Sequence, residues 1–280
     1  MDKENLDIIK ANLKFFQAKA GDYNKEEPSY RPENIKRVNN ILLNIMKRKQ
    51  KVRLLDVGCG TGFVIDLAYK FTKDIVGVDI SNEMLKKVET KNGKIMLVKS
   101  DTSHLPLESN SFDVCTSYGF LHHLYNIRPT IKEAYRCLKK GGIFYADQDP
   151  NYYFWQHAKQ FDYRKIINEI PRTEIINVND PTDGYKKRKM KSLDAVGKKT
   201  IVTAEYQKTS RGGFREEEII KILKNIGFRQ IEFTYEWYIG EAYAKHSLEK
   251  NSDEIIERHM RRCLPLTRNL FKYVRFIAVK

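Results

Sequence analysis

The sequence predicts an α/β fold in which a parallel β-sheet is covered by helices on both faces. Three observations support this fold class: short apolar runs alternate five times with segments of helical periodicity, a glycine-rich loop follows the first run, and 280 residues suffice for one such domain with insertions. Strands of a parallel sheet are buried on both faces, so near-continuous apolar runs are expected in them.

Two helical segments precede the first strand. Residues 4–20 repeat apolar side chains at helical spacing, and residues 33–49 repeat the same pattern. A polar, proline-containing loop, residues 21–32, separates them. We therefore expect an N-terminal helical segment that is distinct from the strand-rich part of the chain.

The strands and their helices then follow in order. The predicted strands span residues 52–57, 75–79, 95–98, 112–116 and 143–146, and the predicted helices span residues 63–71, 82–90 and 127–138. Ser81 is the expected N-cap of the second of these helices, and Gly141-Gly142 are expected to end the third. After a long insertion, the chain is predicted to close with a helix at 214–226, a strand at 230–238, a helix at 253–263 and a terminal strand at 271–279.

Composition argues against several classes of protein. A run of about 18 uncharged apolar residues is absent, which argues against a membrane-spanning helix, and the charged first residues do not resemble a secretory signal. The four cysteines are far apart without a CxxC pair, which argues against a disulfide framework and against a structural zinc site. We expect a cytoplasmic protein without a metal site.

The chain is strongly basic. Lys and Arg total 51 and Asp and Glu total 36, a net charge of +15, and residues 151–280 carry +9 of it. The densest run spans Lys186–Lys191. A basic surface attracts polyanions such as RNA. The run contains no interleaved aromatic residues, however, so a solvated loop is the competing interpretation.

The most informative stretch is LLDVGCGTG, residues 54–62. Glycines at positions 58, 60 and 62 let the backbone approach a ligand closely, and the next helix begins there with its N–H groups facing the same ligand. The last small residue of a dinucleotide-binding GxGxxG motif would fall on Phe63. Asp56 would repel a pyrophosphate but suits a cationic or amino-bearing ligand. A nicotinamide dehydrogenase remains an alternative.

With this loop, the chain resembles the class I S-adenosylmethionine-dependent methyltransferases, in particular their broad small-molecule-type group. The nonapeptide matches the first motif of that family in full, and the resemblance covers residues 35–150 closely and 200–240 loosely. It implies a Rossmann-like, doubly wound, seven-stranded sheet whose last strand is antiparallel. It also implies a methyltransferase domain at 35–280, with residues 1–34 as an N-terminal helical lid and 151–210 as a substrate-cap insertion.

The resemblance implies S-adenosyl-L-methionine as cofactor, S-adenosyl-L-homocysteine as product, and a set of binding residues. Asp79 is expected to bind the ribose hydroxyls, and Asp101 the adenine amino group. The resemblance further implies a cation–π contact of Tyr23 or Tyr30 with the sulfonium and a contact of Arg31 with the methionine carboxylate. For several of these residues, capping or packing is the alternative. The full predicted set is Asp56, Gly58, Gly60, Gly62, Asp79, Ile80, Asp101, Thr102, Tyr118, Tyr23 and Arg31.

The acceptor side is less constrained by the sequence. Methyl transfer from a sulfonium is an in-line displacement with an excellent leaving group, so the protein mainly positions and desolvates the acceptor. A base is required only if the acceptor keeps its proton at neutral pH. His122, His123 and Tyr118 are the candidate catalytic residues, although a histidine pair here can instead cap the next helix. The predicted substrate contacts are Asp147, Asp149, Tyr152 and Trp155.

Besides the nicotinamide dehydrogenase, three functions remain open. The main prediction is a methyltransferase acting on an O, N or C atom of a small molecule. A tRNA methyltransferase that uses the basic C-terminal half is one alternative, although SYGF after the fourth strand differs from the D/N/S-P-P-Y/F/W motif of amino-methylating nucleic-acid enzymes. A non-catalytic cofactor-binding scaffold or regulatory subunit is the other. No membrane partner is expected, and the oligomeric state is open.

Overall fold

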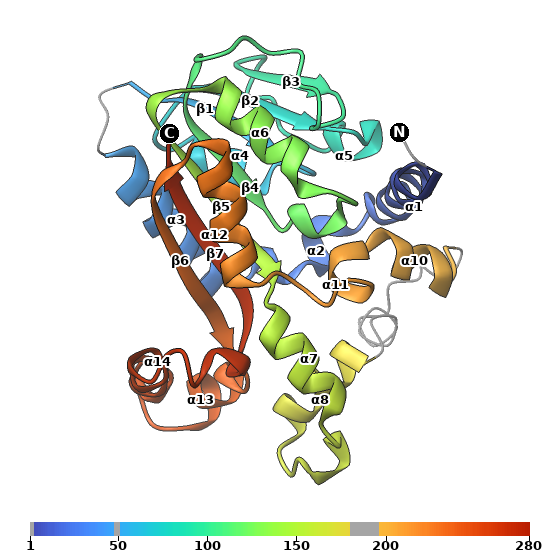
Figure 1. Ribbon diagram of the computed structural model, residues 1–280, viewed down its shortest axis with the longest axis vertical. Coiled ribbons are helices and arrows are strands. Elements are labelled where there is room, and N and C mark those ends of the chain that lie inside the picture. The colour runs from blue at the N-terminus through green and yellow to red at the C-terminus, as the bar shows by residue number, and fades with distance from the viewer. Residues whose placement is uncertain (1–2, 48–50, 180–195) are drawn as a thin grey trace.

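The computed structural model describes residues 3–47, 51–179 and 196–280, which fold around a seven-stranded sheet (Figure 1). The strands are β1 (Arg53–Val57), β2 (Asp74–Asp79), β3 (Ile95–Lys99), β4 (Phe112–Tyr118), β5 (Leu138–Pro150), β6 (Arg229–Tyr238) and β7 (Phe271–Val279). The helices are α1 (Lys3–Lys19), α2 (Tyr23–Glu26), α3 (Pro32–Met46), α4 (Phe63–Ala68), α5 (Asn82–Leu85), α6 (Ile127–Cys137), α7 (Tyr152–Gln160), α8 (Glu169–Asn179), α10 (Lys198–Ala204), α11 (Tyr206–Thr209), α12 (Glu216–Ile226), α13 (Glu241–Ser247) and α14 (Ser252–Arg262).

The sheet confirms the predicted fold class. Its strand order is β3-β2-β1-β4-β5-β7-β6, and β1 to β5 run parallel to one another. The last strand, β7, pairs antiparallel with both β5 and β6. The chain order reverses between β1 and β4, and ligands of such sheets bind at the carboxyl ends of the strands near that reversal.

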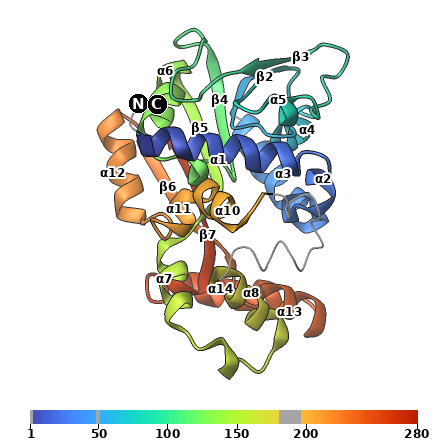
Figure 2. The same ribbon diagram turned by 90° about the vertical axis from the view of Figure 1, so that its right-hand side faces the viewer.

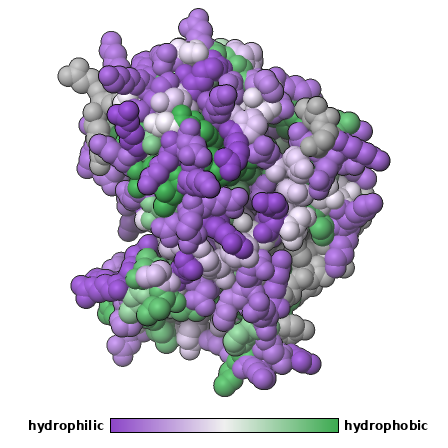
Figure 3. All heavy atoms as spheres, in the orientation of Figure 1, coloured by the Kyte–Doolittle hydropathy of each residue, from purple (hydrophilic) through white to green (hydrophobic). Residues whose placement is uncertain are grey.

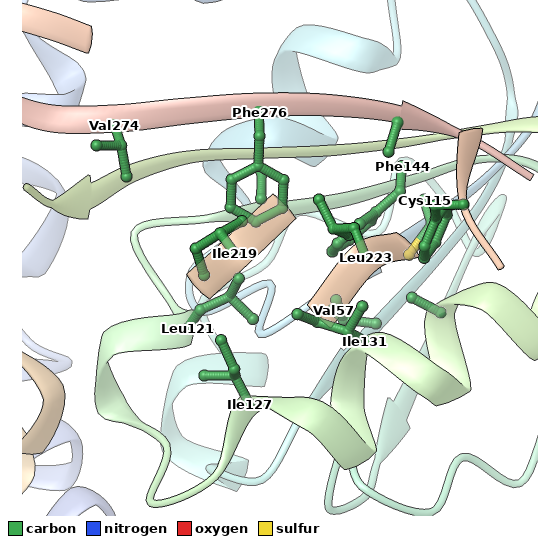
Figure 4. Close-up of a cluster of buried hydrophobic side chains, with 14 of the residues drawn as sticks. Val57, Cys115, Leu121, Ile127, Ile131, Phe144, Ile219, Leu223, Val274 and Phe276 are labelled. Atoms are coloured by element: carbon green, nitrogen blue, oxygen red, sulfur yellow. The ribbon is translucent and has the colours of Figure 1, made fainter. Parts of the chain in front are cut away.

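The two faces of the sheet bury separate apolar cores because successive residues of a strand point to opposite sides. Leu54 packs with α3 and α4, whereas Leu55 packs with α6 and α12. Figure 4 shows the second core, where Ile219 and Leu223 of α12 lie above Ile131 of α6. Cys115 is fully buried in this core, as its place inside an apolar strand predicts.

Several helix ends differ from the prediction. Ser81 caps α5, since its side chain accepts a hydrogen bond from the Met84 N–H, but α5 ends at Leu85 instead of near residue 90. The next long helix, α6, ends at Cys137, so Gly141-Gly142 do not terminate it. They lie inside β5, where the Gly141 N–H donates to the Lys280 carbonyl. The strand β5 therefore begins at Leu138, five residues before the predicted strand.

Two groups of helices lie beyond the carboxyl ends of the parallel strands. In Figure 2, α1 crosses the side of the molecule facing the viewer, with α10 and α11 beneath it. Phe15 of α1 packs on Ile201 and Ala204 of this group. The other group contains α7, α8, α13 and α14, of which α13 was not expected. In the predicted insertion 151–210, α7 ends at Gln160 and α8 begins at Glu169.

The surface is mainly hydrophilic on the face in Figure 3, with small apolar patches, one of them over α13 and α14. In the three described ranges, no helix combines the length and apolar character required to cross a bilayer. All four cysteines carry free thiols. The basic run Lys186–Lys191 lies outside the described residues.

Candidate active site

A cavity of about 880 Å³ lies at the carboxyl ends of the parallel strands. Its floor comes from the ends of β1, β2 and β4 and from the loop after β3, and its opposite wall includes residues of α1. Segments that are far apart in the sequence meet here because parallel strands end at one edge of the sheet. The cavity is therefore where a ligand of this fold is expected.

The glycine loop forms one side of the floor. The N–H groups of Gly58 and Cys59 both donate to the carbonyl of Val78, at 2.8 and 3.0 Å, which fixes the loop to the end of β2. Gly58 has a φ of 70°, and a Cβ there would lie 2.0 Å from the ring of Phe120. Glycine is therefore required at this position by both backbone conformation and space.

Two buried carboxylates border this loop. Asp79 accepts hydrogen bonds from the N–H groups of Gly60 at 2.9 Å and Ser81 at 2.8 Å. Asp56 accepts a 2.6 Å hydrogen bond from the Thr116 hydroxyl. Burial raises the pKa of Asp56 to about 7, and the nearby Asp79 adds to this, while the Thr116 hydroxyl opposes it. A cation beside Asp56 would favour its ionised form.

Ten of the eleven residues predicted to bind the cofactor line this cavity. The exception is Gly62, which takes a left-handed conformation (φ 92°) as N-cap of α4, with a hypothetical Cβ 3.0 Å from Val88. The ten that line the cavity are Asp56, Gly58, Gly60, Asp79, Ile80, Asp101, Thr102, Tyr118, Tyr23 and Arg31.

The histidine pair lies in η2 (Leu121–His123) and also lines the cavity. His122 Nδ1 is 2.9 Å from Asp149 Oδ1, and the His122 backbone N–H donates to the same oxygen at 3.1 Å. His123 Nδ1 is 2.8 Å from the Ala204 carbonyl. Burial lowers the pKa of His122 to about 4 and that of His123 to about 3, so both rings are neutral at pH 7.

Glu205 joins this pair from the insertion, between α10 and α11. Its Oε2 lies 3.7 Å from His122 Nε2 and 3.1 Å from Lys208 Nζ. Burial alone would raise the pKa of Glu205, but Lys208 and the two histidines lower it below its usual range. No local sequence signal marks Glu205, because only the fold brings it to η2 across more than 80 residues.

The structure does not bring Asp147, Asp149 and Tyr152 to the cavity, contrary to their predicted role as substrate contacts. Asp147 is fully buried and forms a 2.9 Å salt bridge with Arg37, and Tyr152 packs its ring 3.9 Å from the Arg215 guanidinium. For Asp147 and Asp149, a β-bulge between Ala146 and Asp149 accounts for the difference, because it re-aims the side chains of β5. Tyr152 instead begins α7. Of the four predicted substrate contacts, only Trp155 lines the cavity.

The same bulge supplies a cavity residue that the sequence did not indicate. Gln148 adopts a φ of 65° and lines the cavity, where its Oε1 accepts a 3.1 Å hydrogen bond from Trp237 Nε1. Glu241 of α13 also lines the cavity, and burial raises its pKa to about 7. Both Trp237 and Glu241 come from the C-terminal part of the chain, which sequence reasoning assigned only to closing the sheet.

Comparison with known proteins connects this cavity to a group of enzymes. A family model described as a methyltransferase domain matches residues 55–146, from β1 into β5. The ubiquinone/menaquinone biosynthesis C-methyltransferase UbiE of Campylobacter jejuni is 28% identical over 195 residues, 66% of this chain and 74% of that protein. A carboxy-S-adenosyl-L-methionine synthase of Nautilia profundicola is 28% identical over 225 residues, 76% of this chain and 84% of that protein.

Two further similarities extend the comparison. An uncharacterized protein of Methanocaldococcus jannaschii is 32% identical over 183 residues, 65% of this chain and 63% of that protein. Among solved structures, an S-adenosylmethionine-dependent methyltransferase from Archaeoglobus fulgidus has a TM-score of 0.54 at 19% identity, with 88% of this chain and 94% of that chain covered. At this identity, the structural likeness supports the fold alone.

Proposed function

We propose that the chain, a class I S-adenosylmethionine-dependent methyltransferase with S-adenosylmethionine as its cofactor, methylates a small molecule inside the cavity described above. The observation that carries this proposal is the size of the cavity together with the residues that line it. Residues of α1, of the insertion and of α13 line it together with the strand ends. A volume of about 880 Å³ is near the upper end for one ligand, which suits a cofactor together with a small acceptor.

The residues of the cavity fit this cofactor. A Cβ at Gly60 would meet only the Met84 side chain within 4 Å, at 3.5 Å, so the bare backbone lies open to a close approach. In this proposal Asp79 holds the ribose, Asp101 the adenine and Asp56 the ammonium group, since each is a carboxylate in the cavity lining. When bound, S-adenosylmethionine supplies an electrophilic methyl group on a positively charged sulfur.

The chain's own residues then position the acceptor and exclude water. In this proposal, residues 1–34 act as a lid and residues 151–210 as a cap. Phe16 of α1 lies 4.9 Å from the His123 ring, and the Asn12 side-chain amide donates a 2.8 Å hydrogen bond to the His123 carbonyl. These contacts tie the lid to η2. A closed lid desolvates the acceptor, which strengthens its attack on the methyl group.

His122 and His123 are the proposed proton acceptors for an acceptor that keeps its proton. Both rings are neutral at pH 7, so each has a nitrogen lone pair available. Asp149 orients His122 through the 2.9 Å contact at Nδ1, an arrangement that leaves Nε2 to accept a proton. The name of the relative UbiE, a C-methyltransferase of quinone biosynthesis, also supports a small acceptor.

The proposal is tested by incubating the purified chain with methyl-labelled S-adenosylmethionine and fractions of a cell extract. We expect the label in the small-molecule fraction, and mass spectrometry of the product should show a gain of one methyl group. A carboxymethyl gain would assign the chain a different reaction. Label in the RNA fraction alone, or cofactor binding without transfer to any fraction, would overturn the proposal.

A further inference from the structure

We propose that His122, His123 and Glu205 form a binding site for a divalent transition-metal ion in the wall of the cavity. One ligand atom from each of the three residues lies within 4.8 Å of the other two. His123 and Glu205 are buried, and His122 is nearly so. The site is therefore preformed by packing, with one side facing the cavity.

The orientation of each imidazole is the first support for this site. Asp149 Oδ1 accepts the His122 backbone N–H and lies 2.9 Å from Nδ1; when ionised, it accepts the hydrogen of Nδ1 as well and leaves the lone pair on Nε2. The Ala204 carbonyl can only accept, so His123 Nδ1 is protonated as well and its Nε2 carries the lone pair. Histidines that bind metals are typically held by such a hydrogen bond at the other nitrogen.

The separation of the ligand atoms is the second support. His122 Nε2 and Glu205 Oε2 face each other at 3.7 Å, and with the hydrogen on Nδ1 both atoms present lone pairs. A tetrahedral ion with bonds of about 2.0 Å holds its ligand atoms about 3.3 Å apart. For this pair a bound ion therefore requires only a small contraction, and the ligand atom of His123 lies within 4.8 Å of both. Lys208 also contacts Glu205 Oε2, at 3.1 Å, so the ion would share this oxygen with Lys208 or displace it.

The ligand set points to a particular class of ion. Two imidazoles and one carboxylate suit Zn²⁺, Fe²⁺, Co²⁺ or Mn²⁺, whereas Ca²⁺ and Mg²⁺ prefer oxygen ligands. Three protein ligands leave a coordination position toward the cavity. An acceptor oxygen bound there would lose its proton more easily. The activation of an acceptor by the metal rests on the proposed function. If it holds, the metal takes the place of His122 and His123 as the group that promotes loss of the proton. Metal binding itself does not depend on the proposed function.

The site is tested with Co²⁺ as a spectroscopic probe. The metal-free full chain is titrated with Co²⁺ and then with Zn²⁺ as competitor. We expect one equivalent of Co²⁺ with visible absorption bands, which Zn²⁺ abolishes. Glu205→Gln should weaken binding at least tenfold because a charged ligand is lost, and Asp149→Asn should weaken it about 10- to 100-fold through the orientation of His122.

The control variant is His157→Gln, which removes an exposed histidine of α7 and should bind Co²⁺ like the wild type. Thermal melting and binding of S-adenosylhomocysteine establish that each variant is folded. The proposal is overturned if the wild type gives no Co²⁺ bands, or if Glu205→Gln binds as tightly as the wild type. Because metal titration requires no acceptor, failure of this site and failure of the methyl-transfer assay are separate outcomes.

Discussion

Gly58 has less space for a side chain than the two other glycines of its loop. A Cβ at Gly58 would lie between 2.0 and 2.5 Å from three atoms of the Phe120 ring, and Phe120 itself lines the cavity. The same addition at Gly60 produces only an ordinary contact. The loop therefore needs Gly58 to keep Phe120 in place, in addition to any contact with the cofactor.

Gly58→Ala is expected to destabilise the protein by about 2–4 kcal/mol, from the left-handed backbone and the collision together. Gly93→Ala is the matched control, because Gly93 has a φ of 78° but nothing within 4 Å of a Cβ. Urea denaturation of both variants measures the difference. Equal losses in the two variants would mean that contact with Phe120 contributes nothing.

Asp79→Ala is expected to abolish cofactor binding. The substitution removes the carboxylate from the cavity and leaves the Gly60 and Ser81 N–H groups without their acceptor. Asp79→Asn, which retains one acceptor oxygen, separates the loss of charge from the loss of these hydrogen bonds. Asp74→Ala, at the opposite end of β2, serves as the control. Calorimetry with S-adenosylhomocysteine gives the affinities, and unchanged affinity in Asp79→Ala would contradict the assignment of the site.

The raised pKa of Asp56 predicts that cofactor affinity depends on pH. With a pKa of about 7, Asp56 is protonated in weakly acidic solution, and an ammonium group can bind it well only after the proton leaves. Affinity should therefore rise with pH by up to about tenfold per unit below about pH 7 and then level off. Asp56→Asn should bind more weakly and lose this dependence. A wild-type profile that is flat between pH 5.5 and 7.5 would exclude an ionised Asp56 from binding.

The same pKa has a consequence for stability. The folded-state value of about 7 lies above the ordinary value of 3.8, so the folded protein holds this proton more tightly than the unfolded chain. The contribution of Asp56 to stability is complete below about pH 3.8 and is lost as pH rises through about 7. A cation beside Asp56 in the complex would offset this loss.

At the scale of elements, α1 depends on the insertion for its position. Phe15 is 1% exposed and packs with Val196, Ile201 and Ala204, all beyond the parallel part of the sheet. This cluster is small and separate from the two cores of the sheet. We therefore expect that α1, as the proposed lid, can open without disturbing the sheet.

Phe15→Ala is expected to loosen α1 while the sheet stays folded. Loss of a buried phenylalanine costs about 3–5 kcal/mol, and here the cost falls on the docking of one helix. Hydrogen exchange should become faster in α1 and α10 and remain unchanged in β1 and β4. Leu6→Ala, at a position that is 43% exposed on the same helix, is the control. Uniformly faster exchange throughout the sheet would show that α1 is part of the global folding unit.

At the scale of the whole molecule, a net charge of +15 raises the question of whether the chain binds and methylates RNA. The cavity is lined by residues of α1 as well as by residues of the C-terminal part of the chain. As the proposed lid, α1 would restrict the access of a macromolecule to it. We expect no retardation of bulk tRNA in gels at about 150 mM salt, where nonspecific electrostatic binding is weak. Retardation that disappears when Lys186 to Lys191 are neutralised would favour the RNA alternative.

The sequence by itself determined the sheet and the floor of the site. Apolar runs, the LLDVGCGTG loop and the acidic residues Asp56, Asp79 and Asp101 are local patterns, and each follows from what one strand and its turn require. These residues lie together because parallel strands end at the same edge. The resemblance to the methyltransferase family also predicted that the last strand is antiparallel, and the strand pairing confirms this.

Only the tertiary structure decided the opposite wall of the cavity. Glu205 reaches His122 through the packing of the insertion, and the bulge in β5 turns Gln148 toward the cavity instead of Asp147 and Asp149. Local sequence patterns do not predict such contacts, because a bulge or an insertion is positioned by long-range packing and not by the periodicity of its own residues.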